Sequence, residues 1–359
     1  MRRDDHAHRH LPSAVPQRHD LRSCAELAPY LARLGISHLY AAPIFEAEPG
    51  STHGYDVVDN RVIDSSLGGD EAFQRMAAAF RAEGMGIVLD FVPNHMSAST
   101  YNPYWRDVLE WGEASDCAQF FDIDWSAPKL LVPALGSSYG AALGEGRFGL
   151  HFDARDGGMT FTYYGLKLPL TPTSYAQVLM RADGEDFAEW ARRFAVATPQ
   201  TSAELKAELA EAARDPATHR AIEQAMAAVA ADADALHELH EMQIWRLTHW
   251  RAARETLTYR RFFEITDLVG MQEERPARPR RDACAAVRSG RSGQDRRHPA
   301  RSHRWSRRSQ SLSGAAAEDR RRGRPVLSRG REDLGAGGGA ARRLAGRRHH
   351  RLRVHPRAR

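Results

Sequence analysis

The chain has 359 residues and a hydrophobic fraction of 42%, which is enough for one large domain or two smaller ones. Its net charge of +5 is distributed unevenly along the chain. Residues 275–359 hold 26 arginines, no lysine and six acidic residues, so residues 1–274 carry a net charge of −15. The body is therefore acidic, which excludes a basic nucleic-acid-binding domain there. No apolar run reaches the ~18 residues that a membrane span needs.

The remaining composition points to a chain that works without a metal or cofactor. The opening residues MRRDDHAHRH are charged but contain no apolar segment of the signal-peptide type, so we expect a cytoplasmic protein. The three cysteines, Cys24, Cys117 and Cys284, lack metal-binding or redox spacing. No phosphate loop or nucleotide motif is present. We therefore expect no metal and no cofactor.

Periodicity predicts two helix–strand pairs at the start of the body. A first helix, ending at Gly35, is indicated by apolar residues at helical spacing: Leu27, Tyr30, Leu31 and Leu34. Residues 36–45 read as a buried strand, residues 70–84 as a second amphipathic helix, and residues 85–95 as a second buried strand. Near-continuous apolar strands of this kind are typical of a parallel sheet covered on both faces. The alternation indicates an α/β fold.

The pattern changes after residue 96. Short aromatic-rich pieces follow, over a stretch too long for a loop, which indicates an inserted subdomain. Within it, residues 202–214 and 217–254 read as helices. A strand-like pattern resumes over residues 257–271, and periodicity ends at about residue 275.

Two short motifs lie where the predicted strands end. HGYD follows the first strand and DFVPNH closes the second, and in a parallel α/β fold these ends build binding sites. The candidate site residues are His53, Tyr55, Asp56, Asp90, Asn94 and His95. A tyrosine ring suits stacking on a sugar, while carboxylate, amide and imidazole groups can bind hydroxyls. From spacing alone, HGYD can equally be a turn and Asp90 a structural carboxylate.

Five stretches together resemble the malto-oligosyltrehalose synthases of the α-amylase superfamily: YLARLGISHLYAAPIF, GSTHGYDVVDN, LGGDEAF, GIVLDFVPNHM and YRRFFEITDLVGM. DFVPNH alone resembles only the superfamily's first signature region, whereas GSTHGYDVVD and YRRFFEITDL are far more specific. The resemblance implies a (β/α)8 barrel. It also implies an enzyme that isomerises the reducing-end α-1,4 link of a maltodextrin into an α,α-1,1 link by intramolecular transglycosylation.

The resemblance also assigns roles to the candidate residues. Tyr55 is implied to stack on the transferred glucose and His95 to hydrogen-bond one of its hydroxyls, while Asp90 and Asn94 brace the site. Such chemistry needs a nucleophilic carboxylate and an acid–base carboxylate near the anomeric carbon. No residue of this chain matches either one. Three nearby carboxylates are therefore left without such a role: Asp107, Asp122 and Asp124.

The arginine-rich tail is explained best as a frame-shifted translation. Read one nucleotide later, GQDRRHPARSHRW (293–305) and its continuation permit G-K-I-D-G-I-R-L-D-H, which resembles the region around the superfamily's nucleophile. At the same offset, residues 326–334 and 346–354 permit further synthase-like stretches, and residues 10–24 permit a first barrel strand. A natural disordered linker fits the composition but not this decoding.

The predicted fold is thus an incomplete (β/α)8 TIM barrel of α-amylase type with an inserted, largely helical subdomain. The expected division is as follows: 1–24 out of frame and unstructured, 25–96 the first part of the barrel, 97–256 the inserted subdomain, 257–274 the return to the barrel, and 275–359 an out-of-frame, arginine-rich disordered tail. We expect an open barrel to leave strand edges unpaired and an apolar face uncovered.

Three functions remain open. The first is a synthase by descent whose partner is a maltodextrin, inactive in this chain because the catalytic carboxylates are missing. The second is an α-amylase-type hydrolase, which differs in how well water is kept from the glycosyl-enzyme. The third is a non-enzymatic module, either a glucan-binding body or a nucleic-acid-binding tail. An arginine-rich arm without lysine or interleaved aromatic residues argues against nucleic acid as a partner.

Overall fold

The computed structural model describes residues 20–254 and 256–272. The predictions made for residues 1–19 and 273–359, including the frame-shifted stretches, lie outside this part of the chain. The α-helices are α1 (Leu21–Glu26), α2 (Ala28–Arg33), α3 (Gly69–Ala82), α4 (Pro103–Trp111), α5 (Tyr139–Gly144), α6 (Tyr175–Leu179), α7 (Glu185–Ala195), α8 (Pro199–Ala212), α9 (Pro216–Ala231) and α10 (Ala233–Glu241).

The strands are β1 (His38–Ala41), β2 (Phe45–Ala47), β3 (Val57–Ile63), β4 (Gly86–Leu89), β5 (His95–Ser97), β6 (Leu130–Leu135), β7 (Phe148–Asp153), β8 (Gly158–Tyr163), β9 (Leu166–Pro169), β10 (Trp245–His249), β11 (Arg261–Phe262) and β12 (Ile265–Gly270). They form sheets of two or three strands, with orders β1-β4, β10-β6, β11-β12-β5, β2-β3 and β7-β8-β9. The part of the chain that the structure describes contains no closed barrel.

The first helix begins earlier than predicted and is broken in two. The side chain of Asp20 caps α1 by accepting a hydrogen bond from the backbone N–H of Ser23 (2.7 Å), so residues 20–24 are not unstructured. Pro29 has no N–H to donate and its ring crowds the preceding turn, so the helix restarts as α2 after Leu27. The predicted end at Gly35 is confirmed by its left-handed φ of 78°.

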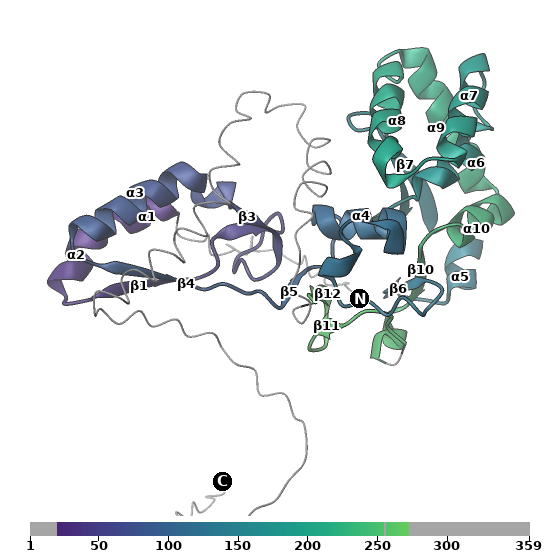
Figure 1. Cartoon of the computed structure of the whole chain (residues 1–359). Coiled ribbons are helices and arrows are strands. Elements are labelled where there is room, and N and C mark those ends of the chain that lie inside the picture. The colour runs from purple at the N-terminus through teal and green to yellow at the C-terminus, as the bar shows by residue number, and fades with distance from the viewer. Residues whose placement is uncertain (1–19, 255, 273–359) are drawn as a thin grey trace, which may run out of the picture.

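The helix–strand alternation is confirmed at the level of topology. Strands β1 and β4 pair in parallel, with His38 opposite Gly86 and Ala41 opposite Leu89. Helices α1 to α3 lie together on one side of this pair (Figure 1), and α3 ends near Gly84 as predicted. A first hydrophobic core fills the space between them, built around Met76 and Phe80 of α3.

Both predicted strands are shorter and less buried than expected. The stretch 36–45 divides into β1 and β2, and 85–95 divides into β4 and β5, which belong to different sheets. Pro43 and Pro93 interrupt them, since proline has no N–H for a ladder hydrogen bond. No residue of β4 is fully buried, and Tyr40 of β1 is exposed. The reason is that helices cover only one face of this strand pair.

The inserted region is a mixture of helices and strands, which corrects the prediction that it is largely helical. Helices α8 and α9 confirm two predicted helices, each started by a proline in its first turn. The stretch 217–254, predicted as helix, instead contains α9, α10 and the strand β10. Asp232 separates the two helices by capping α10, and the apolar residues of β10 pair in parallel with β6.

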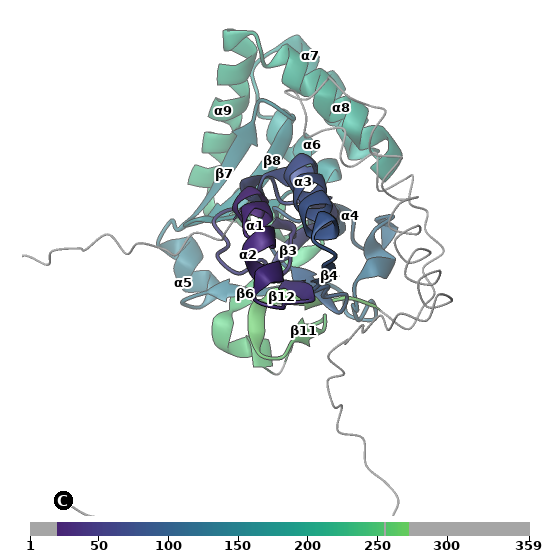
Figure 2. The same ribbon diagram turned by 90° about the vertical axis from the view of Figure 1, so that its left-hand side faces the viewer.

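A second, larger hydrophobic core holds this region together. The antiparallel sheet β7-β8-β9 packs against α9 and α6, with Phe161 and Tyr175 fully buried. Trp105 of α4 and Trp245 of β10 lie in the same core. Figure 2 shows α7, α8 and α9 standing over the sheet at one end of the molecule.

The predicted return of the chain over residues 257–271 is confirmed as a β-hairpin. Strand β12 pairs antiparallel with both β11 and β5, and Gly270 lies opposite His95. This pairing brings the two ends of the inserted region together beside the DFVPNH motif. Across residues 20–254 and 256–272, no helix has the length and apolar character required to cross a bilayer.

Candidate functional site

The HGYD and DFVPNH motifs meet through a side-chain contact. The hydroxyl of Tyr55 donates a hydrogen bond to Oδ2 of Asp90 (2.8 Å). Asp90 directly follows β4, and its backbone N–H donates to the carbonyl of Ala41 at the end of β1 (2.9 Å). The predicted juxtaposition at the carboxyl ends of two parallel strands therefore exists. The Tyr55 side chain remains about one-third exposed, with a relative accessibility of 38%.

HGYD is also a hydrogen-bonded turn. The hydroxyl of Ser51 donates to Oδ1 of Asp56 (2.5 Å) and accepts from the backbone N–H of Gly54 (3.0 Å). Nδ1 of His53 accepts from the backbone N–H of Tyr55 (3.0 Å). Gly54 has a φ of 77°, a conformation that glycine adopts without strain. The turn reading holds for His53 and Asp56, and the turn presents Tyr55 to the site.

His95 is enclosed rather than presented to a ligand. Its side chain is 2% exposed, and its two ring nitrogens lie 2.8 Å from Oδ1 of Asn94 and 3.2 Å from the carbonyl of Tyr55. The ring of Phe262 stacks on it with centroids 4.0 Å apart. Burial lowers the pKa of His95, so the ring is neutral near pH 7. These contacts make His95 a brace for Tyr55, and they leave no ring nitrogen for a sugar hydroxyl.

Asn94 ties the motif to the returning chain. Its carbonyl accepts a hydrogen bond from the backbone N–H of Met271 (2.9 Å), and its side chain contacts His95. Phe262 and Met271 both belong to the returning segment, so the site depends on residues far apart in sequence. The contribution of Phe262 was missed by sequence reasoning, although it lies in the YRRFFEITDL stretch that carries part of the resemblance.

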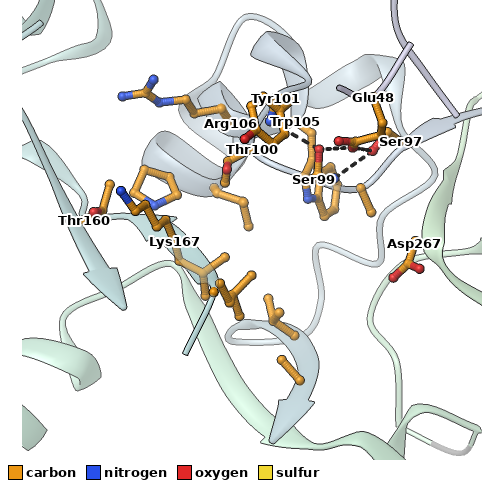
Figure 3. A pocket seen from close by; sticks show the side chains of 18 of the residues that line it. Glu48, Ser97, Ser99, Thr100, Tyr101, Trp105, Arg106, Thr160, Lys167 and Asp267 are labelled. Carbon is orange, nitrogen blue, oxygen red and sulfur yellow. Dashed lines mark hydrogen bonds between the residues drawn. The ribbon is translucent and has the colours of Figure 1, made fainter. Parts of the chain in front are cut away.

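A cavity of about 750 Å³ adjoins this site and shares Asp56 with it. On one wall the carboxylate of Glu48 accepts hydrogen bonds from the hydroxyls of Ser97 and Ser99 (Figure 3). Lys167 of β9 lines another side of the cavity, and its amino group lies near Thr160 (Figure 3). Unlike Asp56, the other residues named here were not predicted as part of a site: Glu48, Ser97, Ser99, Thr160 and Lys167. No spacing pattern in the sequence links β5, β9 and the loop after β2.

The cavity is lined by both polar and apolar side chains. Hydroxyl, carboxylate and ammonium groups line it together with the exposed ring of Tyr101, and they offer both hydrogen-bond donors and acceptors. A volume of about 750 Å³ is within the range of small-molecule sites. The arrangement can therefore bind a polyhydroxylated chain that extends past Tyr55.

The nearby carboxylates make no catalytic pair, in agreement with the decision to leave them unassigned. Asp107 accepts a hydrogen bond from Ser115, and burial raises its pKa to about 6. Asp122 pairs with Arg260 (2.7 Å). Asp124 accepts hydrogen bonds from the backbone and hydroxyl of Ser126. Each therefore has a structural partner.

One group in the described residues could in principle hold a metal ion: His237, His240 and Glu241 on α10. Nε2 of His240 accepts a hydrogen bond from the backbone N–H of Leu247 (3.3 Å), which places the proton on Nδ1, and a coordinating Nδ1 must lose that proton. Glu241 is also paired with Arg246 (2.5 Å). The expectation of no metal therefore stays a prediction.

Comparisons with known proteins agree with this geometry. Residues 11–140 match the family described as alpha amylase, catalytic domain. A Mycobacterium tuberculosis protein, provisionally named a maltooligosyl trehalose synthase, is 32% identical over 252 residues, which cover 69% of this chain and 24% of that protein. The intracellular maltogenic amylase of Bacillus subtilis is 36% identical over 104 residues, covering 29% of this chain and 17% of that enzyme.

A solved structure shows the same fold. The hypothetical maltooligosyl trehalose synthase of Sulfolobus tokodaii superposes with a TM-score of 0.51 at 24% identity, over 76% of this chain and 29% of that one. Residues 11–140 are thus similar to the α-amylase catalytic-domain class, and the solved structure shares the fold. Within that class, the resemblance to the malto-oligosyltrehalose synthases is confirmed. The chain spans about a quarter of the length of the synthase relatives it matches.

Proposed function

We propose that this chain is the maltodextrin-binding part of a malto-oligosyltrehalose synthase. The observation that carries the proposal is the hydrogen bond between Tyr55 and Asp90, which sets an exposed aromatic ring at the ends of β1 and β4, beside a cavity lined by both polar and apolar side chains. In this site Tyr55 stacks on a glucose ring. Glu48 and Lys167 bind hydroxyls of the neighbouring sugar units, while Asp90, Asn94 and His95 hold the ring of Tyr55 in place.

The complete reaction is an intramolecular transglycosylation. One carboxylate attacks the anomeric carbon and displaces the reducing-end glucose, which a second carboxylate protonates. The released glucose turns within the site and attacks through its own anomeric hydroxyl, forming the α,α-1,1 link. Neither carboxylate has a counterpart among residues 20–254 and 256–272. The chain as translated therefore binds maltodextrin and does not convert it.

The missing carboxylates are explained by the shifted reading frame. The synthase-like stretches decoded from the tail follow one offset and keep the order of nucleophile first and acid second. Determining the gene sequence across the codons for residues 23–25 and 275–280 tests this directly. Single-nucleotide differences at both places support a frame-shifted record of an intact synthase. A confirmed sequence means that the gene itself carries the shift.

Reducing-end chemistry distinguishes the candidate functions. A synthase removes the reducing end of maltopentaose, whereas a hydrolase creates a new one with each cleavage. We expect the 359-residue chain to bind maltopentaose in isothermal titration without changing the number of reducing ends. Tyr55→Ala should abolish binding. A rise in reducing ends would favour the hydrolase. Salt-dependent binding to RNA, with no binding to maltopentaose, would overturn the proposal.

The synthase is favoured over the hydrolase by the extent of the similarity. The match to the maltogenic amylase covers 29% of the chain, whereas the match to the M. tuberculosis protein covers 69% and includes the inserted region. The cavity is formed largely by that inserted region, through β7, β8 and β9.

A further inference from the structure

A two-residue turn joins β11 to β12 and carries a strained residue. Phe263 and Glu264 form the turn, and Phe263 has a φ of 53°. Tight hairpins favour a positive φ at this first position because it matches the twist of the strands, and glycine normally supplies it. In an L-residue the Cβ atom crowds the backbone in this conformation. A phenylalanine here therefore opposes folding.

The side chain of Phe263 does not compensate by burial. It is 70% exposed, among the most exposed of the large apolar side chains in the described part. A residue that is both conformationally strained and exposed contributes little to folding. Strained positions can mark functional sites, so the turn is a candidate for a binding role.

A chain of ring contacts connects Phe263 to the candidate site. Its ring lies edge-on to that of Phe262, with centroids 4.5 Å apart. Phe262 stacks on His95 at 4.0 Å, and His95 contacts the carbonyl of Tyr55 at 3.2 Å. Phe262 pairs with Ile265 of β12, and β12 pairs with β5 opposite His95, so the hairpin that carries Phe263 is joined to the strand that follows the DFVPNH motif.

We infer that Phe263 is a second stacking platform for the pyranose rings of a bound α-glucan, an inference that rests on the proposed function. The apolar face of a pyranose packs on an aromatic ring, and its hydroxyls remain available to the polar groups around it. Tyr55 then holds one sugar unit and Phe263 another. Charged residues on either side of the hairpin tip, Arg261 and Glu264, suit a hydroxyl-rich ligand better than a broad apolar protein interface.

Replacement by glycine separates a binding role from a structural one. Phe263→Gly should raise the urea midpoint of unfolding, because glycine adopts this φ without strain. The same variant should weaken maltopentaose binding by about tenfold, the upper range for an aromatic stacking contact. Phe263→Tyr keeps the ring and should retain the wild-type affinity.

The chain offers a matched control for the strain itself. Tyr164 lies at the same position of the two-residue turn between β8 and β9, with a φ of 48° and 70% exposure. The guanidinium of Arg147 lies over its ring. Tyr164→Gly should raise the urea midpoint by a similar amount and leave the affinity for maltopentaose unchanged.

The outcomes separate this inference from the proposed function. If the wild-type chain does not bind maltopentaose, the proposed function fails and the inference fails with it. If the wild type binds and Phe263→Gly binds equally well, the inference alone is overturned. A fall in stability for Phe263→Gly assigns the ring a structural role. A change in oligomeric state at constant affinity, seen by sedimentation, assigns it to self-association. Either of these results also overturns the inference.

Discussion

The hydroxyl of Tyr55 donates a hydrogen bond of 2.8 Å to the carboxylate of Asp90, although 35 positions separate the two residues in sequence. The contact joins the loop between β2 and β3 to the end of β4. It fixes the position of the Tyr55 hydroxyl, and hence of its ring, relative to β4. The orientation of Tyr55 is therefore set by a group on a different element, and this orientation is what a stacking residue needs.

Removing the Tyr55 hydroxyl should lower both stability and affinity by modest amounts. Tyr55→Phe keeps the ring but loses the hydrogen bond, which is worth about 1 kcal/mol of unfolding free energy. We expect a weaker affinity for maltopentaose in titration calorimetry because the ring is less well oriented. Asp90→Asn is the control, since the amide oxygen can still accept from the hydroxyl. A loss of affinity in Asp90→Asn as large as in Tyr55→Phe would contradict the view that the hydrogen bond alone orients the ring.

Asp107 and His240 are buried groups that should make the free energy of unfolding depend on pH in opposite directions, so that their two contributions nearly cancel. Burial raises the pKa of Asp107 from 3.8 to about 6, so the folded state binds more protons than the unfolded state between these values. Stability due to Asp107 therefore falls as pH rises from about 4 to 6. Burial lowers the pKa of His240 from 6.5 to about 4. Here the unfolded state binds more protons, so stability rises with pH over about 4 to 6.5.

Single substitutions should reveal each slope. In Asp107→Asn the histidine effect remains, so stability should increase with pH between about 4 and 6.5. In His240→Phe the carboxylate effect remains, so stability should decrease over about 4 to 6. Each effect is on the order of 3 kcal/mol across its window. Urea unfolding of both variants and the wild type at half-unit pH intervals measures the differences. Parallel curves for all three would contradict the prediction.

Removing one member of the charged pair Lys206–Glu110 should lower the free energy of unfolding strongly, whereas replacing both members with apolar residues should lower it little. Nζ of Lys206 lies 2.7 Å from Glu110, and both side chains are largely buried between α8 and α4. Lys206→Met leaves the carboxylate with only Arg106, at 3.6 Å, and should cost about 3 kcal/mol. The double variant Lys206→Met/Glu110→Leu should recover most of that loss. A double-mutant cycle from urea unfolding tests this, and additive losses would refute it.

The residues that were predictable from sequence are those governed by local rules. Gly35 ends a helix because of its own backbone freedom, and the richness in Ala, Glu and Leu of residues 202–214 matches α8. The meeting of Tyr55 and Asp90 followed from strand order, since parallel strands end at one edge. These features depend on few residues close in sequence, or on topology alone.

What the sequence could not predict depends on contacts between distant segments. The enclosure of His95 results from Phe262, which is brought back beside β5 only by the pairing of β12. The cavity joins Glu48 to Lys167 through three separate elements, and no periodicity encodes that meeting. The sequence predicts helix where β10 lies. The segment forms a strand instead because its pairing with β6 overrides local propensity, as tertiary contacts often do.

The exposed face of the first helices should drive self-association. Leu27, Tyr30 and Leu34 are each about half exposed, although their spacing is that of a core-facing helix surface. This agrees with the expectation that an apolar face is left uncovered. Tyr30→Glu combined with Leu34→Lys should reduce association without lowering the urea midpoint, because neither side chain is buried. A lysine is also favourable at the end of α2.

The neighbouring Leu31 is the matched control for that surface. Leu31 packs against the core around Met76. Leu31→Glu should therefore lower the free energy of unfolding by on the order of 2 kcal/mol, and the urea midpoint with it, in contrast to the surface pair. Light scattering coupled to size-exclusion chromatography measures the mass of each variant. A wild-type chain that is monomeric at all concentrations would show that the exposed face is not adhesive. If the surface pair unfolds as readily as Leu31→Glu, that face is packed in solution.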